Sequence, residues 1–348
     1  MNFLKYLEKK FRDPNLPFVI AEIGHNHKGS LKIAKELFLQ AKNCGANAVK
    51  MQKRNNKELF VKNFYNEPYV NKNSYGNTYG EHREYLEFNK KEYLELIKFS
   101  KKIDILFFCT PFDFSSVDFL EDLNFPLYKI ASADLNNLLL QERIAKIKKP
   151  IFLSTGGGNY KEIDRAYKNI IKFNKKLSIM HCTASYPVKI EEMNLNVISV
   201  LRKRYKETII GLSDHENGID AASIAYMLGA RVFEKHFTLD RSWKGTDHSF
   251  SLEPEGLRKF VRNLNRISIM LGSSEKRLLD SEVAPLTKMM KSIVAAKSLK
   301  KNHKIQLKDL AFKSPGGGMQ PFEYKILLKK KLKKNINKDD LFKINFIK

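Results

Sequence analysis

The sequence predicts an α/β protein in which a (β/α)8 barrel is followed by a small β-rich domain. Short apolar runs alternate eight times with stretches of helical spacing over about 260 residues, which is typical of this barrel. The runs lack strict alternation of apolar and polar residues, as expected of strands buried on both faces. Toward the C-terminus the pattern changes to shorter, lysine-rich runs. A doubly wound open sheet is the alternative, which is disfavoured because no GxGxxG motif follows the first run.

Each strand and helix of the barrel can be placed in order. Strands are predicted at the apolar runs Phe18–Ile23, Ala48–Lys53, Ile105–Thr110, Leu127–Ser132, Ile151–Thr155, Ser178–Thr183, Ile209–Ser213 and Arg231–Phe237. Helical spacing between them predicts helices such as Leu31–Asn43, Lys91–Lys102, Glu162–Lys172, Ile219–Leu228 and Pro254–Met270. The longest insertion, residues 54–90, is rich in Asn, Tyr and Gly and is predicted to be a loop over the barrel mouth.

The domain boundaries follow from a change in composition. Residues 1–275 are assigned to the catalytic barrel. A polar stretch that includes Pro285 predicts a linker over residues 276–288. Residues 289–348 form the small β-rich domain, which buries little apolar surface alone and is expected to depend on a partner.

The composition narrows the classes of partner. The 348 residues include 63 basic and 38 acidic side chains, for a formal net charge of +25. Such a charge raises nucleic acid as an alternative partner. Only 13 of the basic residues are Arg, however, which is the residue that reads bases by bidentate contacts. We interpret the lysine excess as solvated surface and expect no nucleic-acid partner.

The expected location is the cytoplasm. The three cysteines, Cys44, Cys109 and Cys182, lie far apart and form no CxxC pair, which indicates a reducing compartment. No apolar run approaches the roughly 18 residues that a membrane span needs. Residues 1–15 lack the apolar core and the cleavage site of a secretory signal.

Polar residues at the ends of the strands predict an anion-binding active site. The catalytic site of such a barrel lies at the C-terminal ends of its strands. Two lysines, Lys50 and Lys129, fall there together with four hydroxyl side chains, namely Thr110, Ser132, Ser154 and Ser213. Ammonium groups and hydroxyl donors suit a phosphate or a carboxylate. The backbone N–H groups of residues 156–158, three glycines before a helix, are further candidate donors.

Two histidines predict a metal site, with alternatives left open. His215 and His236 end the seventh and eighth strands, so their imidazoles are expected to converge on a divalent metal. Lys129 or Lys50, as a lysine within a strand, is also a candidate for Schiff-base formation in an aldolase. Glu22, before a glycine at the end of the first strand, is either a loop cap or a catalytic carboxylate.

A series of motifs then resembles one family nearly end to end. In chain order they are AEIGHNHKGS, AVKMQK, CTPFD, YKIASAD, STGGG, HCTASYP, GLSDHENG, FEKHFTLDRSWKGTDHSFSLEP and SPGGGMQP. They resemble the sialic acid synthase family, whose last domain is an antifreeze-like (SAF) module. This resemblance implies condensation of phosphoenolpyruvate (PEP) with an N-acetylated aldohexose, such as N-acetylmannosamine, to a nine-carbon 2-keto acid.

The resemblance also implies roles for individual residues. PEP is expected to bind Lys50, Thr110, Lys129, Ser132, Ser154, Tyr186 and Ser213. The metal, Mn²⁺ with Mg²⁺ or Co²⁺ as alternatives, is expected on His215 and His236. Glu22 and Asp247 are the expected catalytic carboxylates, and the sugar is expected to face Gln52, Asp134 and Asp247.

Three departures from the family pattern bear on these expectations. Ala184 stands where an Asn is common, so its hydrogen bond is missing or is supplied by Ser185. Asp134 stands in place of the usual Glu and is one methylene shorter. Ser314 replaces an arginine of the SAF domain that reaches the partner's active site in bacterial members, and the neighbouring Lys313 is no isostere of it.

The resemblance leaves the acceptor open and implies an oligomer. The stretches SYGNTYGEHREYLEF and LDRSWKGTDHSFSLEP resemble the animal branch of the family, which raises N-acetylmannosamine 6-phosphate beside the free sugar. Deoxy, diacetamido precursors of legionaminic and pseudaminic acid are further alternatives. The SAF domain implies a domain-swapped homodimer.

Overall fold

The computed structural model describes residues 16–348. Residues 1–15, which were considered above for a secretory signal, lie outside the described residues. The chain divides into two compact units with the boundary between Gly272 and Ser273.

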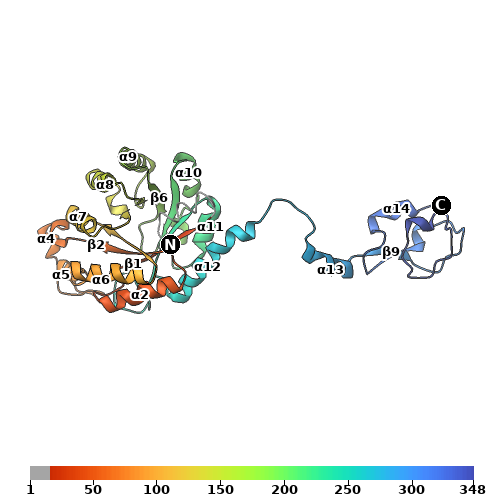
Figure 1. The fold of residues 1–348 in the computed structure, drawn as a ribbon, viewed down its shortest axis with the longest axis horizontal. Coiled ribbons are helices and arrows are strands. Elements are labelled where there is room, and N and C mark those ends of the chain that lie inside the picture. Colours follow the sequence, from red (N-terminus) through yellow and green to blue (C-terminus); the bar gives the residue numbers. More distant parts are fainter. Residues whose placement is uncertain (1–15) are drawn as a thin grey trace. The chain divides into compact units, whose positions relative to one another are not determined.

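The first unit is a closed barrel of eight parallel strands that pair in chain order, as predicted (Figure 1). The strands are β1 (Phe18–Gly24), β2 (Ala48–Lys53), β3 (Leu106–Pro111), β4 (Tyr128–Ile130), β5 (Ile151–Ser154), β6 (Leu177–Cys182), β7 (Ile209–Asp214) and β8 (Val232–His236). Strand β4 ends earlier than predicted because Ser132–Asp134 turn into a 3-10 helix, in which the N–H of Asp134 donates to the carbonyl of Ala131 at 3.0 Å.

Helices surround the strands and alternate with them (Figure 1). They are α2 (Leu31–Asn43), α6 (Lys90–Lys102), α7 (Phe114–Asp122), α8 (Leu138–Lys146), α9 (Tyr160–Ile171), α10 (Val197–Arg204), α11 (Asp220–Leu228) and α12 (Pro254–Leu271). Side-chain caps mark the starts of α2, α6, α7, α8 and α9. The side chain of Asn159, for example, accepts the N–H of Glu162, whose carboxylate accepts the N–H of Asn159 in return.

The insertion over residues 54–90 is more structured than predicted. Instead of a plain loop it contains three short helices, α3 (Asn56–Leu59), α4 (Lys62–Tyr65) and α5 (Tyr79–Tyr85). Helix α5 begins at a reciprocal cap between Thr78 and Glu81. These elements hold the side chains of the insertion in defined places beside the barrel.

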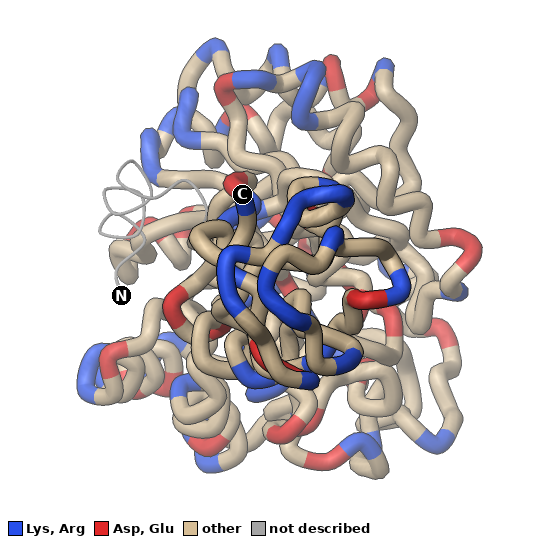
Figure 2. The backbone as a smooth tube through the Cα atoms, turned by 90° about the vertical axis from the view of Figure 1, so that its right-hand side faces the viewer, with Lys and Arg blue, Asp and Glu red and all other residues tan. Residues whose placement is uncertain are grey.

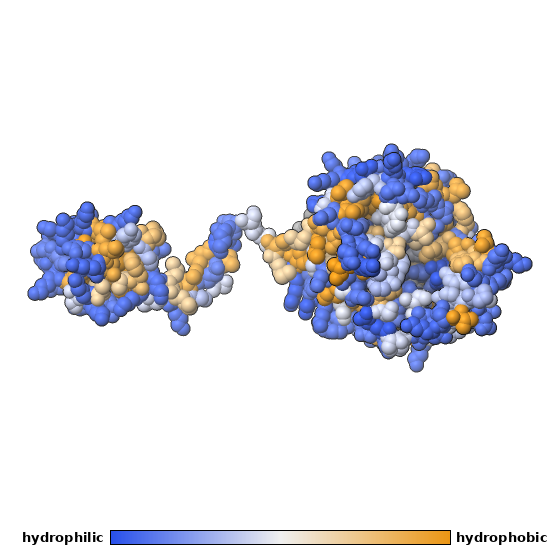
Figure 3. Space-filling view, turned by 180° about the vertical axis from the view of Figure 1, so that it is seen from behind, coloured by the Kyte–Doolittle hydropathy of each residue, from blue (hydrophilic) through white to orange (hydrophobic). Residues whose placement is uncertain are grey.

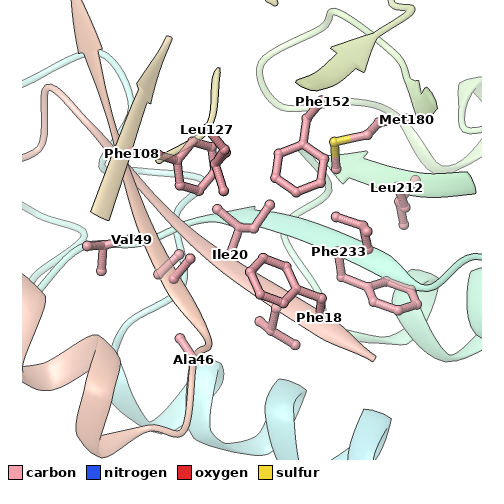
Figure 4. Packing of buried hydrophobic residues seen from close by; sticks show 14 of the residues in the cluster. Phe18, Ile20, Ala46, Val49, Phe108, Leu127, Phe152, Met180, Leu212 and Phe233 are labelled. Carbon is pink, nitrogen blue, oxygen red and sulfur yellow. The ribbon is translucent and has the colours of Figure 1, made fainter. Parts of the chain in front are cut away.

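Aromatic and aliphatic side chains fill the inside of the barrel (Figure 4). The ring of Phe152 lies 6.2 Å from that of Phe18 and 5.6 Å from that of Phe108, measured between centroids. All three are fully buried, and each such side chain contributes about 1.5–3 kcal/mol. This packing leaves the C-terminal ends of the strands for polar residues.

One ion pair is buried beside β7 and β8. The ammonium of Lys235 lies 2.7 Å from a carboxylate oxygen of Asp214 and also contacts the carbonyl of Glu216. Replacing Asp214 with Asn leaves this ammonium buried without its counter-charge, so we expect the free energy of unfolding to fall by about 3 kcal/mol. Denaturant unfolding followed by the fluorescence of Trp243, the single tryptophan, measures the change.

The matched control for that substitution is Asp118→Asn. Asp118 pairs with Arg143 on the exposed surface, where an ion pair contributes less than about 1 kcal/mol. Equal losses for Asp214→Asn and Asp118→Asn would contradict a stabilising role for the buried pair.

The second unit contains α13 (Asp280–Met289), the antiparallel strands β9 (Ser292–Ala295) and β10 (Leu310–Lys313), and the short helix α14 (Tyr324–Leu327). It has a small apolar core of its own. Lysines mark many of its turns (Figure 2). Helix α13 falls largely within the stretch predicted as a linker. It begins there because the carboxylate of Glu282 accepts the N–H of Leu279 at 2.9 Å, although Pro285 lies inside it.

Within residues 16–348, no helix is both long and apolar enough to cross a lipid bilayer.

Candidate active site

A cavity of about 630 Å³ opens at the C-terminal ends of the barrel strands. Twelve of the thirteen predicted site residues line it, namely Glu22, Lys50, Gln52, Thr110, Lys129, Ser132, Ser154, Tyr186, Ser213, His215, His236 and Asp247. They come from all eight strands or from the loops that follow them. The barrel therefore brings together side chains that are spread over more than two hundred residues of sequence.

The floor of the cavity is a cluster of two lysines and two glutamates. The ammonium of Lys50 lies 2.9 Å from Glu22 Oε2 and 3.0 Å from Thr110 Oγ1. The ammonium of Lys129 lies 2.9 Å from both carboxylate oxygens of Glu234, and Glu234 Oε1 is 3.5 Å from Lys50 Nζ. All of these side chains are buried. Each lysine thus has a carboxylate partner from the chain itself.

Burial and charge act in opposition on these groups. Burial raises the pKa of Glu22 above its usual value, against the lowering effect of Lys50. Burial also lowers the pKa of Lys129, which the charge of Glu234 opposes. Although burial works against its ionised form, the two lysines hold the pKa of Glu234 below its usual range. Glu22 is accordingly the carboxylate closer to neutrality, which suits proton transfer.

Glu234 is a residue to which the sequence assigned no role. It lies two positions before His236 on β8, so both side chains point to the same side of the strand. The alternation of side chains along a strand could therefore have predicted that Glu234 faces the same side as His236.

The two histidines lie together, with ring centroids 5.3 Å apart. His215 Nδ1 lies 2.8 Å from the carbonyl of Thr183. His236 Nδ1 is buried without a hydrogen-bond partner and lies 3.7 Å from Asp247 Oδ2. Burial lowers the pKa of both imidazoles to about 4, so both are neutral near pH 7. Neutral imidazoles with an unpartnered nitrogen fit a divalent metal.

The chain supplies only part of a metal coordination sphere. Among the described residues, no group of three or more His, Cys, Asp and Glu side chains is assembled for an ion. A metal held by His215 and His236 would therefore take its further ligands from water and substrate.

Two of the three residues predicted to face the sugar line the cavity, and the third does not. Gln52 Nε2 donates to Glu22 Oε1 at 2.9 Å, and Asp247 accepts from the hydroxyl of Thr246 at 2.8 Å, both at the cavity wall. Asp134 does not line the cavity. Its shorter carboxylate accepts instead from the side chain of Asn137 at 3.0 Å, one turn along its own segment.

The structure corrects the expectation for Ser185 and part of the expectation for the three glycines at 156–158. Ser185 does not supply the missing donor near Ala184, because its hydroxyl donates to the carbonyl of Pro187 at 3.1 Å. Of the three glycines at 156–158, Gly156 donates its N–H to Ser132 Oγ and Gly158 donates to the carbonyl of Thr155. These two N–H groups are engaged within the chain.

Ser314 and Lys313, at the position where the resemblance implies an arginine, make contacts within their own unit. The hydroxyl of Ser314 accepts from Lys291 at 2.9 Å and donates to the carbonyl of Met289 at 3.1 Å. Lys313 pairs with Asp339 at 2.5 Å within the same unit. Both side chains therefore have partners in the C-terminal unit.

The insertion adds two arginines that sequence reasoning missed. Arg54 follows β2 directly, and Arg83 lies on α5; both line the cavity. The ring of Phe112 stacks on the Arg54 guanidinium at 3.9 Å. Arg54 could have been predicted, because it follows the end of a predicted barrel strand, where site residues lie. Arg83 could not, because it does not follow the end of a strand.

A closed barrel whose strand ends gather lysines, hydroxyls, carboxylates and neutral imidazoles in one cavity defines a barrel enzyme with an active site for an anionic substrate. Comparison with known proteins identifies the family. The NeuB family matches residues 37–276, and the SAF domain matches residues 291–347. The chain belongs to the NeuB family.

Several relatives carry names of sugar-acid synthases. The N-acetylneuraminate-9-phosphate synthase of Homo sapiens is 41% identical over 278 residues, which cover 80% of this chain and 77% of the human protein. The N,N'-diacetyllegionaminic acid synthase of Campylobacter jejuni is 36% identical over 93% of this chain and 98% of its own. A crystal structure of the N-acetylneuraminic acid synthetase from Leptospira borgpetersenii, in complex with citrate, is 35% identical with a TM-score of 0.68, covering 78% of this chain and 90% of that chain.

Proposed function

We propose that the protein condenses PEP with the open-chain aldehyde of an N-acetylated hexose, giving a nine-carbon 2-keto acid and phosphate. The observation that carries this proposal is the buried pair Lys50 and Lys129, which shares one cavity with hydroxyl groups and two neutral imidazoles. Relatives named synthases of N-acetylneuraminate 9-phosphate, legionaminic acid and pseudaminic acid support it.

The lysines and the hydroxyl groups of the cavity would bind PEP. Its phosphate and carboxylate are charged at neutral pH, so two ammonium groups and hydrogen-bond donors can hold both. The donors are Thr110, Ser132, Ser154 and Ser213. Tyr186, whose ring centroid lies 4.2 Å from that of His215, would form the wall at the rim.

His215 and His236 would hold the divalent metal, for which we propose Mn²⁺ before Mg²⁺ or Co²⁺. When bound, such an ion acts as a Lewis acid on a carbonyl oxygen. Gln52 and Asp247, which line the same cavity, would hold the sugar hydroxyls.

The bond changes then balance without a redox partner. C3 of PEP attacks the aldehyde carbon, forming the new C–C bond, while the C=O π electrons move to the aldehyde oxygen and positive charge is left at C2. Water adds at C2 and gives up a proton, for which Glu22 is the proposed acceptor, and one proton is delivered to the former aldehyde oxygen, which becomes a hydroxyl. The C2–O bond to phosphate then breaks with its electron pair on the phosphate, the C2 hydroxyl loses its proton to form the ketone, and the 2-keto acid and hydrogen phosphate leave.

Phosphate release tests the proposal. The protein is incubated with PEP, Mn²⁺ and a panel of 2-acetamido sugars, and inorganic phosphate is measured. The lowered pKa of Lys129 favours one second candidate, a Schiff-base aldolase. Borohydride trapping of a pyruvate adduct on Lys129 or Lys50 would support the aldolase, whereas phosphate release that a chelator inhibits supports the synthase. Release with none of the sugars would overturn the proposed function.

Glu234→Gln should change the pH dependence of PEP use. Burial lowers the pKa of Lys129 and the charge of Glu234 opposes this, so loss of that charge lowers the pKa further. As the pH rises, the Lys129 ammonium of the variant therefore loses its proton at a lower pH than that of the wild type. We expect the alkaline limb of kcat/KM for PEP to move down by about one pH unit. Glu234→Asp, which keeps the charge, should move it less, and an unchanged limb in Glu234→Gln would refute the role of this carboxylate.

We further propose a domain-swapped homodimer in the cytoplasm. Exposed apolar side chains occur on both units, on α13 with Val283 and Met289 and, separately, at the end of α12 with Met270 (Figure 3). Exposed apolar surface of this kind on either unit is typical of an interface. Sedimentation that finds only monomer at micromolar concentration would contradict the dimer. The three free, buried cysteines agree with a reducing compartment.

A further inference from the structure

Arg54 and Arg83 converge on one side of the cavity, and the reaction proposed above leaves them without a role. Arg54 Nη1 lies 3.0 Å from His25 Nε2, and Arg83 Nη1 lies 3.3 Å from His25 Nδ1. The imidazole of His25 thus lies between the two guanidinium groups and, in its neutral form, accepts a hydrogen bond from only one of them. Arg54 is buried and Arg83 is partly exposed, yet both line the same cavity as Lys50 and Lys129.

The partners of these guanidinium groups are neutral. Arg54 donates to Gln52 Oε1 at 2.6 Å, and Arg83 donates to the hydroxyl of Tyr79 at 2.7 Å. Burial, followed by the charges of the two arginines, lowers the pKa of His25 well below its usual value, so its ring carries no charge near pH 7. Over residues 16–348 neither guanidinium forms an ion pair with a carboxylate. The two neighbouring positive charges at the cavity wall are therefore balanced only from a distance, by the carboxylates of Glu87 and Asp247.

The position of Arg54 and Arg83 in the cavity favours contact with the acceptor sugar rather than with PEP. Gln52 accepts from Arg54 through Oε1 and donates through Nε2 to Glu22, which in turn pairs with Lys50. The arginines therefore lie on the opposite side of Gln52 from the proposed PEP lysines. Asp247, the other proposed sugar contact, lines the cavity together with both arginines and also lines a small neighbouring pocket with His25.

We propose that Arg54 and Arg83 bind a phosphoryl group on the acceptor, at the end of the sugar remote from its aldehyde. This inference rests on the proposed function and names its substrate class, a 2-acetamido hexose 6-phosphate. The free hexose and the deoxy, diacetamido hexoses carry no charge, whereas a phosphate monoester carries nearly two negative charges and accepts bidentate hydrogen bonds from guanidinium groups. Among these acceptors, only the phosphate ester supplies a negative charge in direct contact with the two guanidinium groups.

The test compares two acceptors that differ only in the phosphate. Values of kcat/KM are measured for N-acetylmannosamine and for its 6-phosphate at saturating PEP. The expected result is a preference for the phosphorylated sugar of at least about 100-fold in the wild type. Arg83→Gln should reduce this preference ratio by about 30-fold, and Arg83→Lys, which keeps the charge, should restore part of it. Calorimetric titration with the 6-phosphate in the absence of PEP should show the same order of affinities.

The control variant is Arg165→Gln, an exposed arginine of α9 outside the cavity, for which the ratio should stay at the wild-type value. Equal or better use of the free sugar by the wild type would overturn this inference and leave the proposed function intact. An unchanged ratio in Arg83→Gln would overturn it as well. Absence of phosphate release from PEP with both acceptors, and with the diacetamido sugars, would instead mark failure of the proposed function itself.

Discussion

Glu22→Gln lowers the turnover number for phosphate release by about 1,000-fold, within the range that a general base contributes. The amide keeps the size of the side chain, so the hydrogen bond from Gln52 can survive while the proton acceptor is lost. Because Glu22 is buried and its pKa is raised, the carboxylate is matched to a proton transfer rather than to a solvated surface role. Single-turnover phosphate release at saturating PEP and acceptor measures the effect.

The control for Glu22→Gln is the same chemical change on the surface. Glu36 is exposed on α2, so Glu36→Gln should retain wild-type turnover. A thermal unfolding curve shows whether Glu22→Gln remains folded. Near-normal turnover in folded Glu22→Gln protein would assign the proton transfer to another group.

His215→Ala and His236→Ala each lower metal-dependent turnover by at least about 100-fold, because each removes one of the two imidazoles proposed to bind the metal. The variants should also lose bound Mn²⁺, measured by atomic absorption after desalting. The second readout separates a ligand from a residue that merely shapes the pocket.

A histidine outside the cavity serves as the comparison. His303 lies in the C-terminal unit and contacts Asp309, so His303→Gln should keep both metal content and turnover. If His215→Ala or His236→Ala retained near-normal turnover together with bound metal, the ligand assignment would be refuted.

The barrel and the two lysines of its site were predictable from sequence because both depend on local pattern. Buried parallel strands are short apolar runs, and their C-terminal ends meet at one mouth, so Lys50 and Lys129 could be placed together before any coordinates. Which of the side chains after a strand end line the cavity is harder to predict from sequence. Asp134 follows a strand end like the others, yet its shorter carboxylate bonds to Asn137 instead of lining the cavity.

Residues outside the strand ends escaped prediction for other reasons. Arg83 reaches the cavity through helix α5 of an insertion whose path no barrel rule determines. Glu234 lies within a strand, where a carboxylate is explained only by the two lysines from β2 and β4 that neutralise it. Such a pairing across the barrel connects residues more than one hundred positions apart in sequence, which local patterns do not encode.

The two glutamates beneath the lysines have a consequence for the catalytic cycle. On the proposed reaction, an incoming anion enters by ion exchange, since it must displace Glu22 from Lys50 and Glu234 from Lys129. A multiply charged ester can compete for both lysines, whereas a singly charged carboxylate such as pyruvate competes poorly. After the phosphate has left, the product retains only a carboxylate at this end. Glu22 and Glu234 then pair again with Lys50 and Lys129, which favours product release and returns the site to the state that binds the next molecule of PEP.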